Sequence, residues 1–374
     1  MRADFEFHFS DLPDPRVNRR KVYPLLEIVF LVVSAAISGC DGWKAIKDFG
    51  DIKIKWLRKF FPYENGIPVD DTIARLMGKL NTKAFQGCFI NWISSAMKAV
   101  KGDVVSIDGK TLRRSHDRTN EKSAIHMVSA WSHAYGLVLG QEKTEEKSNE
   151  ITAIPALLEV LALKGCIVTL DAMGCQTEIV AKIVEKKADY VIAVKGNQAT
   201  MHEEISDYFQ IAQGADFKSI SHDYHKELDM GHGRVESREC WTINANQPYF
   251  TKMHCWKNIK SVAMVVTERD LGDKKTRETR YFLSSLASDA KTTLSTVRQH
   301  WGIENSLHWV LDMTFREDES RIRRGVAAEN FAMVRHMALN VLKRDKSVET
   351  SIASKKRMAA FDDKFRTKLI RQAF

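Results

Sequence analysis

Two short, mostly apolar runs, each leading into an aspartate, constrain the fold of this chain more than any other feature. The runs Val104–Ile107 and Cys166–Leu170 precede Asp108 and Asp171. Short apolar runs bounded by turn residues are typical of strands buried on both faces of a sheet. Such strands belong to α/β folds, in which helices cover the sheet. We therefore expect the two aspartates at the ends of two central strands.

The residues around these runs predict three strands followed by alternating helices and strands. The predicted order is strand 104–108, strand 125–132, strand 137–143, helix 150–163, strand 166–171, helix 176–187 and strand 190–194. This succession is typical of a ribonuclease-H-like α/β fold. With strand 166–171 beside strand 104–108, Asp108 and Asp171 share one edge of the sheet, where open α/β sheets bind ligands.

The sequence pattern divides the whole chain into three predicted parts. Residues 1–100 predict a helical N-terminal domain that could bind DNA, and residues 68–75 resemble the turn and recognition helix of a helix-turn-helix, as any short capped helix does. Residues 101–345 predict the catalytic domain, with a β-rich insertion at about 214–280. A helix from about Leu294 is expected to carry Glu304, and residues 346–374 form a basic C-terminal tail.

Charge and apolar content restrict the partners. The net charge is +9, and residues 343–371 hold ten Lys and Arg against four Asp and Glu. This excess favours a polyanion such as nucleic acid, although a solvated charged helix has the same composition. The apolar run 28–37 is too short to span a bilayer, so we expect a buried helix there and no membrane partner. The cysteines show no CxxC spacing, which indicates reduced thiols in the cytoplasm.

Three acids are the candidate catalytic residues. Asp108 and Asp171 share an edge of the predicted sheet, and Glu304 lies on a helix far downstream. Carboxylate oxygens are the ligands that Mg²⁺ prefers, and a pair of such ions about 4 Å apart promotes in-line displacement at a phosphodiester. The small residues after each aspartate leave room for a phosphate to approach. The pattern predicts an enzyme that acts on nucleic-acid strands.

Five segments, in order along the chain, match a known family: Ser106–Lys110, Thr169–Ala172, Ala193–Gln198, Gly231–Arg238 and His300–Asp312. They resemble the DDE transposases of bacterial insertion sequences, close to the H-repeat-associated proteins, and the resemblance covers nearly the whole chain. It implies that Asp108, Asp171 and Glu304 are catalytic ligands of two Mg²⁺ ions, with Mn²⁺ as a substitute. It also implies cleavage of DNA at the element ends, followed by attack of the freed 3′-hydroxyl on target DNA.

One departure concerns the broader superfamily, in which Tyr, Arg and Lys occupy fixed places around the glutamate. Val297, His300 and Leu311 stand at those places here. The phosphate-binding roles of the basic residues therefore do not transfer. His300, Asn305 and His308 are the candidates to replace them.

Other candidate DNA contacts lie near the catalytic edge or in a glycine-flanked loop: Lys110, Arg113, Lys195, Asn197, Gln198, His232 and Arg234. An exposed turn is the alternative for residues 195–198. Trp301 and Trp309 are expected in the core, with base stacking as their alternative.

The leading hypothesis is a transposase that acts as a homodimer on double-stranded DNA, both element ends and target, in the cytoplasm at the nucleoid. Two alternatives stay open: a metal-dependent nuclease of the same fold that cuts without joining, and a DNA-binding remnant of a mobile element without catalysis.

Overall fold

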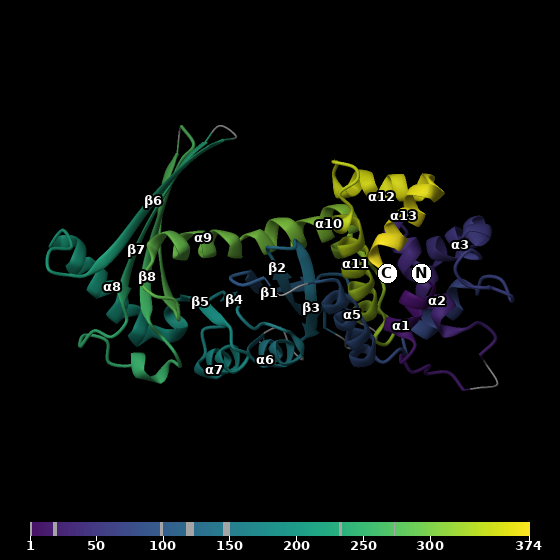
Figure 1. Ribbon diagram of the computed structural model, residues 1–374, viewed down its shortest axis with the longest axis horizontal. Helices are drawn as coiled ribbons and strands as arrows, with labels where there is room; N and C mark the ends of the chain where they lie inside the picture. The colour runs from purple at the N-terminus through teal and green to yellow at the C-terminus, as the bar shows by residue number, and fades with distance from the viewer. Residues whose placement is uncertain are drawn as a thin grey trace.

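The computed structural model describes residues 2–17, 21–97, 100–116, 123–144, 150–231, 234–272 and 274–374. A long mixed sheet with helices on both faces continues into a group of helices at one end of the molecule (Figure 1). The predicted mixed α/β fold with a helical N-terminal region is confirmed. None of the described helices is both long and apolar enough to cross a membrane.

Within the described residues, nine strands form one sheet in the order β3-β2-β1-β4-β5-β9-β8-β7-β6. Their bounds are β1 Val104–Leu112, β2 Ile125–Ser132, β3 Leu137–Lys143, β4 Ile167–Leu170, β5 Asp189–Val194, β6 His222–Gly231, β7 Arg234–Asn244, β8 Ser261–Asp270 and β9 Lys275–Ser284. β4 is parallel to β1 and to β5, and every other neighbouring pair is antiparallel. The strands found in the segment 214–280 therefore extend the central sheet.

Two strands are longer than the sequence predicted. β1 does not end at Asp108, because its antiparallel pairing with β2 continues to Leu112 after the parallel pairing with β4 stops at Ser106. β9 begins at Lys275, inside the segment 214–280 expected to be an insertion, and it pairs with β8 along its whole length. In both cases a hairpin partner supplies hydrogen bonds that an apolar pattern does not reveal.

Helices cover both faces of the sheet. α6 (Glu150–Val160) and α7 (Thr177–Glu185) lie below β4 and β5 in Figure 1, α9 (Ala290–His300) crosses above them, and α8 (Ala199–Gly214) lies at the left end beside β7 and β8. The apolar side of α9 packs on the inner positions of β1, β4 and β5, including Val104 and Ile167. The C-terminal end of α9 therefore lies over the strands that carry the aspartates.

Glu304 lies in the helical stretch that was expected to carry it, at the start of a π-helical turn. α9 ends at His300, a π-helical turn spans Glu304–His308, and α10 (Trp309–Phe315) follows. A π-helical turn is wider than an α-helical one and is frequent at functional sites.

The remaining helices form the other end of the molecule: α1 Arg2–Phe9, α2 Leu25–Ile37, α3 Trp43–Leu57, α4 Asp70–Met77, α5 Thr82–Ala96, α11 Ala327–Arg344, α12 Ile352–Phe361 and α13 Asp363–Ala373. The two chain ends lie side by side there (Figure 1). The ring of Phe374 stacks on Trp92, with ring centroids 4.9 Å apart, and meets Phe5 edge-on.

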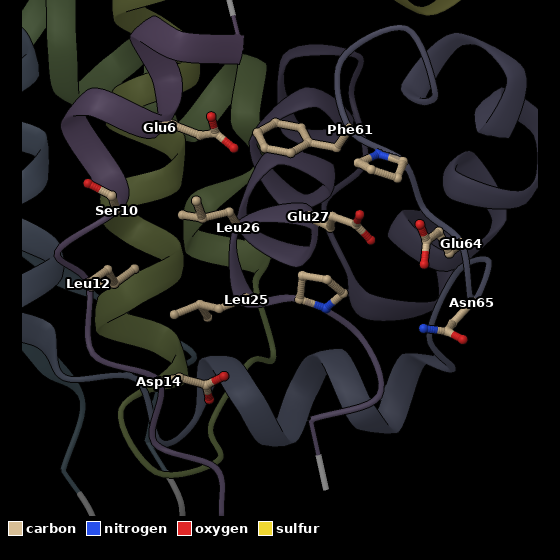
Figure 2. A pocket seen from close by; sticks show the side chains of 12 residues that line it. Glu6, Ser10, Leu12, Asp14, Leu25, Leu26, Glu27, Phe61, Glu64 and Asn65 are labelled. Carbon is tan, nitrogen blue, oxygen red and sulfur yellow. The ribbon is translucent and has the colours of Figure 1, made fainter. Parts of the chain in front are cut away.

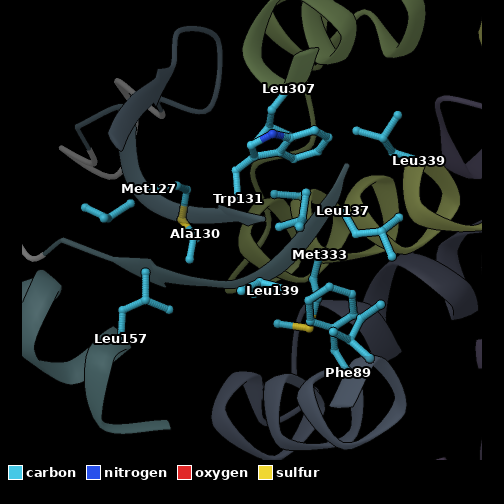
Figure 3. Close-up of a cluster of buried hydrophobic side chains, with 14 of the residues drawn as sticks. Phe89, Met127, Ala130, Trp131, Leu137, Leu139, Leu157, Leu307, Met333 and Leu339 are labelled. Atoms are coloured by element: carbon cyan, nitrogen blue, oxygen red, sulfur yellow. The ribbon is translucent and has the colours of Figure 1, made fainter. Parts of the chain in front are cut away.

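One apolar core joins the helical end to the sheet. Trp131 and Leu137 of the β2–β3 hairpin face Leu307, Met333 and other buried side chains of the flanking helices (Figure 3). Leu307 belongs to the same π-helical turn as Glu304. The core therefore anchors the segment that presents the glutamate.

Candidate active site

The three predicted acids line one cavity of about 410 Å³. The register of β1 and β4 places Ser106 opposite Thr169, and continuing it by two residues brings Asp108 opposite Asp171. Glu304 reaches the same cavity from the start of the π-helical turn. Two strand positions and one helical turn, far apart in sequence, therefore converge on one space.

His308 belongs to this group, because its ring lies between two of the acids. Its Nδ1 is 3.1 Å from Oε2 of Glu304 and 3.6 Å from Oδ2 of Asp108. Ligand atoms of Asp108, Glu304 and His308 all lie within 4.8 Å of one another. The sequence suggested His308 as a DNA contact, but its ring is 3% exposed and sits among the carboxylates.

Negative charge is concentrated at this edge of the sheet. Burial, together with the nearby charges of Asp171, Glu150 and Glu304, raises the pKa of Asp108 to about 7, against a hydrogen bond from the backbone of Gly109. Burial also raises the pKa of Asp171, although the backbone N–H groups of Met173 and Gly174 donate to its Oδ1. Hard divalent cations fit such a set of crowded carboxylate oxygens.

The sequence analysis missed Glu150, a fourth acid beside the site. It begins α6 and shares a hydrogen bond of 2.5 Å with Nε2 of His126, whose Nδ1 is 2.8 Å from Oγ1 of Thr111. A Cβ on Gly109 would collide with the side chains of Glu150 and His126, so a larger residue there would displace this pair. The sequence did offer one signal for Glu150: it is an acid in the first turn of the first helix after the three strands.

Lys110 is engaged inside the fold. Its Nζ lies 2.6 Å from Asp312, 3.0 Å from Glu317 and 3.5 Å from Asp318. Glu317 is buried and also faces the buried guanidinium of Arg335, with 3.5 Å between Oε1 and Nη1. The charge of Lys110 therefore ties β1 to the segment that follows α10.

Arg113, the residue after the end of β1, is more accessible than Lys110. Its side chain is 80% exposed, and its Nε is 3.1 Å from Asp318. The side chain of Arg323 donates to the backbone carbonyl of Arg114, so a second basic segment lies alongside. The sequence analysis did not single out that segment, although Arg321, Arg323 and Arg324 form a visible basic run.

Of the three candidate DNA contacts after β5, two bind a neighbouring loop and one is exposed at the cavity. Asn197 donates to the carbonyl of Ala172 at 2.6 Å, and Gln198 donates to the carbonyl of Cys175 at 2.9 Å. Both amides therefore hold the loop that follows Asp171. Lys195 is exposed and lines the cavity of the three acids.

His300 is enclosed at the end of α9. Its Nδ1 is 3.0 Å from Oγ1 of Thr169, and burial lowers its pKa to about 4. The ring is therefore neutral near pH 7 and does not supply the positive charge of the superfamily's arginine. Asn305 is exposed on the π-helical turn, and its side chain donates to the carbonyl of Trp301.

The two tryptophans lie on the surface, although they were expected in the core. Trp301 is 49% exposed and Trp309 is 58% exposed. Trp301 lines the cavity, and the guanidinium of Arg280 lies 4.6 Å from its ring centroid. Exposed rings beside the cavity match the alternative of base stacking better than core packing.

Two candidates lie on the long β6–β7 hairpin, which projects from the body (Figure 1). Arg234 begins β7 opposite Gly231 at the outer end of the hairpin. His232 lies outside the described residues.

A second cavity, of about 370 Å³, lies among the N-terminal helices (Figure 2). Its lining includes the acids Glu6, Asp14, Glu27 and Glu64. An acidic lining repels phosphate, so this cavity is a poor DNA site.

Comparison with known proteins agrees with these features. Residues 100–341 match the family described as "Transposase DDE domain", and residues 7–93 match the one described as "DDE_Tnp_1-associated". The chain is 42% identical to "Putative transposase YncI" of Escherichia coli O157:H7 over 95% of this chain and 91% of that protein. It is 40% identical to "H repeat-associated putative transposase YhhI" of Escherichia coli strain K12 over 95% of this chain and 94% of that protein.

Among solved structures, the chain is similar to a piggyBac transposase in a synaptic complex with hairpin DNA. The likeness has a TM-score of 0.45 and 11% identity over 99% of this chain and 80% of that one. The sequence resemblance is confirmed by the family matches and the full-length relatives. The chain belongs to the DDE transposases of the H-repeat-associated family.

Proposed function

We propose that this chain is an active transposase that binds the ends of its element, cuts a DNA strand there and transfers the freed end to target DNA. The convergence of Asp108, Asp171 and Glu304 on one cavity supports this proposal most strongly. A purely structural role does not account for three acids at one cavity, where the charges of Asp171 and Glu304 help to raise the pKa of Asp108.

In this proposal the three acids hold two divalent cations, Mg²⁺ or in its place Mn²⁺. Bound there, the cations would stabilise the charge that develops on the attacking and leaving oxygens. The carboxylates fix the geometry, and the ring of His308 packs between two of them to keep their spacing. Lys195, exposed at the rim, attracts the DNA backbone.

The fold supports the same assignment. In the first five strands of the sheet order, β3-β2-β1-β4-β5, a three-stranded antiparallel part adjoins parallel strands that alternate with helices. We take this part as a ribonuclease-H-like core. We divide the chain into a helical domain at 1–100, a catalytic domain at 101–345 that includes β6 to β9, and a basic C-terminal segment at 346–374.

Double-stranded DNA, both element end and target, is the proposed partner, and we propose a homodimer on it. The exposed cations beside the cavity support a DNA path along the end of β1. Arg113 and the basic run Arg321–Arg324 lie on one side of it, and Lys195 lies at the cavity itself. Trp301, at the cavity rim, is placed to stack on a base.

An assay with purified full-length protein and DNA that carries the element ends tests the proposal. We expect Mg²⁺-dependent cleavage and joining by the wild type. Asp108→Asn and Glu304→Gln should each lower both by a factor of about 100 or more while DNA binding persists. Asp207→Asn, which changes an exposed acid on α8, is the matched control and should act as the wild type.

The products decide between the proposal and its rivals. Cleavage without joined product identifies a nuclease. DNA binding without any Mg²⁺-dependent cleavage identifies a DNA-binding remnant. Normal strand transfer by Asp108→Asn refutes the assignment of the site.

A further inference from the structure

Each of the three acids follows a polar residue that lies two or four positions earlier in the chain. Ser106 precedes Asp108 by two residues on β1, and Thr169 precedes Asp171 by two on β4. Residues two apart on a strand share a face, and residues four apart on a helix lie one turn apart. His300 precedes Glu304 by four, so the same relation holds for the third acid.

These three side chains touch one another beneath the acids. Oγ1 of Thr169 donates to Oγ of Ser106 at 3.0 Å and lies 3.0 Å from Nδ1 of His300. Oγ of Ser106 lies 3.0 Å from Nε2 of His133, which follows β2. Ser106 and Thr169 are fully buried, so their hydrogen bonds do not exchange with water. The result is a chain of four polar side chains that spans β1, β4, the β2–β3 hairpin and α9.

The hydrogens of this chain run in one direction. Thr169 donates its only hydroxyl hydrogen to Ser106, so Nδ1 of His300 must donate to Thr169. Ser106 in turn donates to Nε2 of His133. This order requires a neutral His133 ring, because its Nε2 accepts, and burial lowers the pKa of His133. Every hydroxyl then both donates and accepts, which is the satisfied state for a buried polar group.

The ring of His133 also rests against the backbone that leads to Glu304. A Cβ on Gly302 would collide with Cε1 of the His133 ring. Only glycine therefore lets the helical segment approach the hairpin this closely. The distance between the turn that carries Glu304 and the two strands is fixed both by these hydrogen bonds and by this contact.

We infer that Ser106, Thr169, His133 and His300 are positioning residues that set the spacing of Asp108, Asp171 and Glu304 for divalent cations. The inference deepens the proposed function and rests on it. It replaces the DNA contact expected for His300, whose ring is turned to Thr169. Mg²⁺ and Mn²⁺ are sensitive to such spacing, because small octahedral cations tolerate little displacement of their ligands.

Calorimetric titration of the full-length protein with Mn²⁺ tests the inference without a turnover measurement. Thr169→Val removes the hydroxyl at nearly constant volume, and we expect it to weaken Mn²⁺ binding tenfold or more, as loss of a supporting hydrogen bond typically does. Thr169→Ser retains the hydroxyl and should bind within about threefold of the wild type. Thr293→Val is the matched control, because the hydroxyl of Thr293 is equally buried and has no hydrogen-bond partner among the described residues.

The outcomes separate this inference from the proposed function. Weakened binding in Thr169→Val, with restoration in Thr169→Ser and no change in Thr293→Val, supports the positioning role. Mn²⁺ binding by Thr169→Val at wild-type strength, with loss in Asp108→Asn, overturns the positioning role alone. A wild type that binds no Mn²⁺ overturns both. If circular dichroism shows that Thr169→Val is unfolded, Ser106→Ala breaks the same chain and is held to the same criteria.

Discussion

At the scale of single residues, burial decides which charged groups serve the site and which serve the fold. Asp108 is largely enclosed with other acids nearby, whereas Lys110, two residues along the same strand, is surrounded by three carboxylates. The charge of Asp108 is not balanced by a nearby cation, whereas the charge of Lys110 is balanced by carboxylates around it. Their substitutions should therefore have opposite effects on stability.

Replacing Asp108 by Asn should stabilise the cation-free protein at high pH. The pKa of Asp108 is raised from 3.8 to about 7 in the folded state. The stability that the Asp108 side chain contributes is therefore fully present below pH 3.8 and is lost as the pH rises through 7. Asn does not ionise, so the gain should be on the order of 2 kcal/mol at pH 8 and smaller at pH 5. Urea unfolding with chelator at the two pH values measures it, and equal gains at both would contradict the raised pKa.

Replacing Lys110 by Met should destabilise the protein by about 3 to 5 kcal/mol, because the buried carboxylate of Glu317 loses a close partner. Urea unfolding measures the loss. Lys226→Met is the control, since Lys226 pairs with Glu239 on the exposed β6–β7 hairpin, where such a pair contributes little. If Lys110→Met keeps wild-type stability and only weakens DNA binding, Lys110 is a DNA contact after all.

At the scale of elements, the C-terminal helices are part of the core. α13 buries Leu369 and Ile370, and the carbonyl of Ala373 accepts a hydrogen bond from Nε1 of Trp92. The guanidinium of Arg366 lies over the ring of Trp56, 4.2 Å from its centroid. These contacts close the helical end of the molecule.

Truncation after Asp362 should therefore destabilise the N-terminal helices. Trp92 would lose the hydrogen bond from its ring nitrogen and the stacked ring of Phe374. Loss of two or more buried side chains of this size costs several kcal/mol, at about 2 to 5 kcal/mol each. Calorimetric melting of the truncated chain should show a transition more than about 5 °C lower. An unchanged transition would mean that α13 does not contribute to the core.

The elements that the sequence predicted are those whose stability comes from their own apolar pattern. β4 was found because its four residues are all buried. β6 was not found, because its side chains are mostly exposed and its strand form depends on pairing with β7. α12 and α13 were treated as a basic tail, because nothing in the sequence shows that Lys355 and Arg366 find carbonyl partners inside the protein.

The same distinction holds for the site. The three acids were identifiable from strand ends and family wording, and they meet at one cavity. Glu150, His133 and the hydroxyl of Thr169 were not, because their roles arise from contacts between distant segments. Such contacts follow from the register of strands and the approach of α9, which local patterns do not encode.

At the scale of the whole molecule, charge and shape favour a long polyanion. The net charge is +9, and the molecule extends from the helical end to the β6–β9 end along one long axis (Figure 1). Exposed cations include Lys195 at the cavity and Arg113 just after β1. DNA binding should therefore depend steeply on salt.

Arg113→Gln should reduce that salt dependence. Removing one phosphate contact lowers the slope of log K against log salt by about 1 and weakens binding to all DNA sequences alike. Fluorescence anisotropy at several salt concentrations measures the slope. Arg113→Lys keeps the charge and should keep the slope, so an unchanged slope in Arg113→Gln would place Arg113 outside the DNA path.

The arrangement of the three acids around bound cations can be tested most directly by diffraction. Crystals of the full-length protein with element-end DNA and Mn²⁺ should give anomalous difference peaks between the carboxylates of Asp108, Asp171 and Glu304. Peaks that lie elsewhere, or a Glu304 carboxylate turned away from the two aspartates in that complex, would contradict the assignment of this cavity as the catalytic centre.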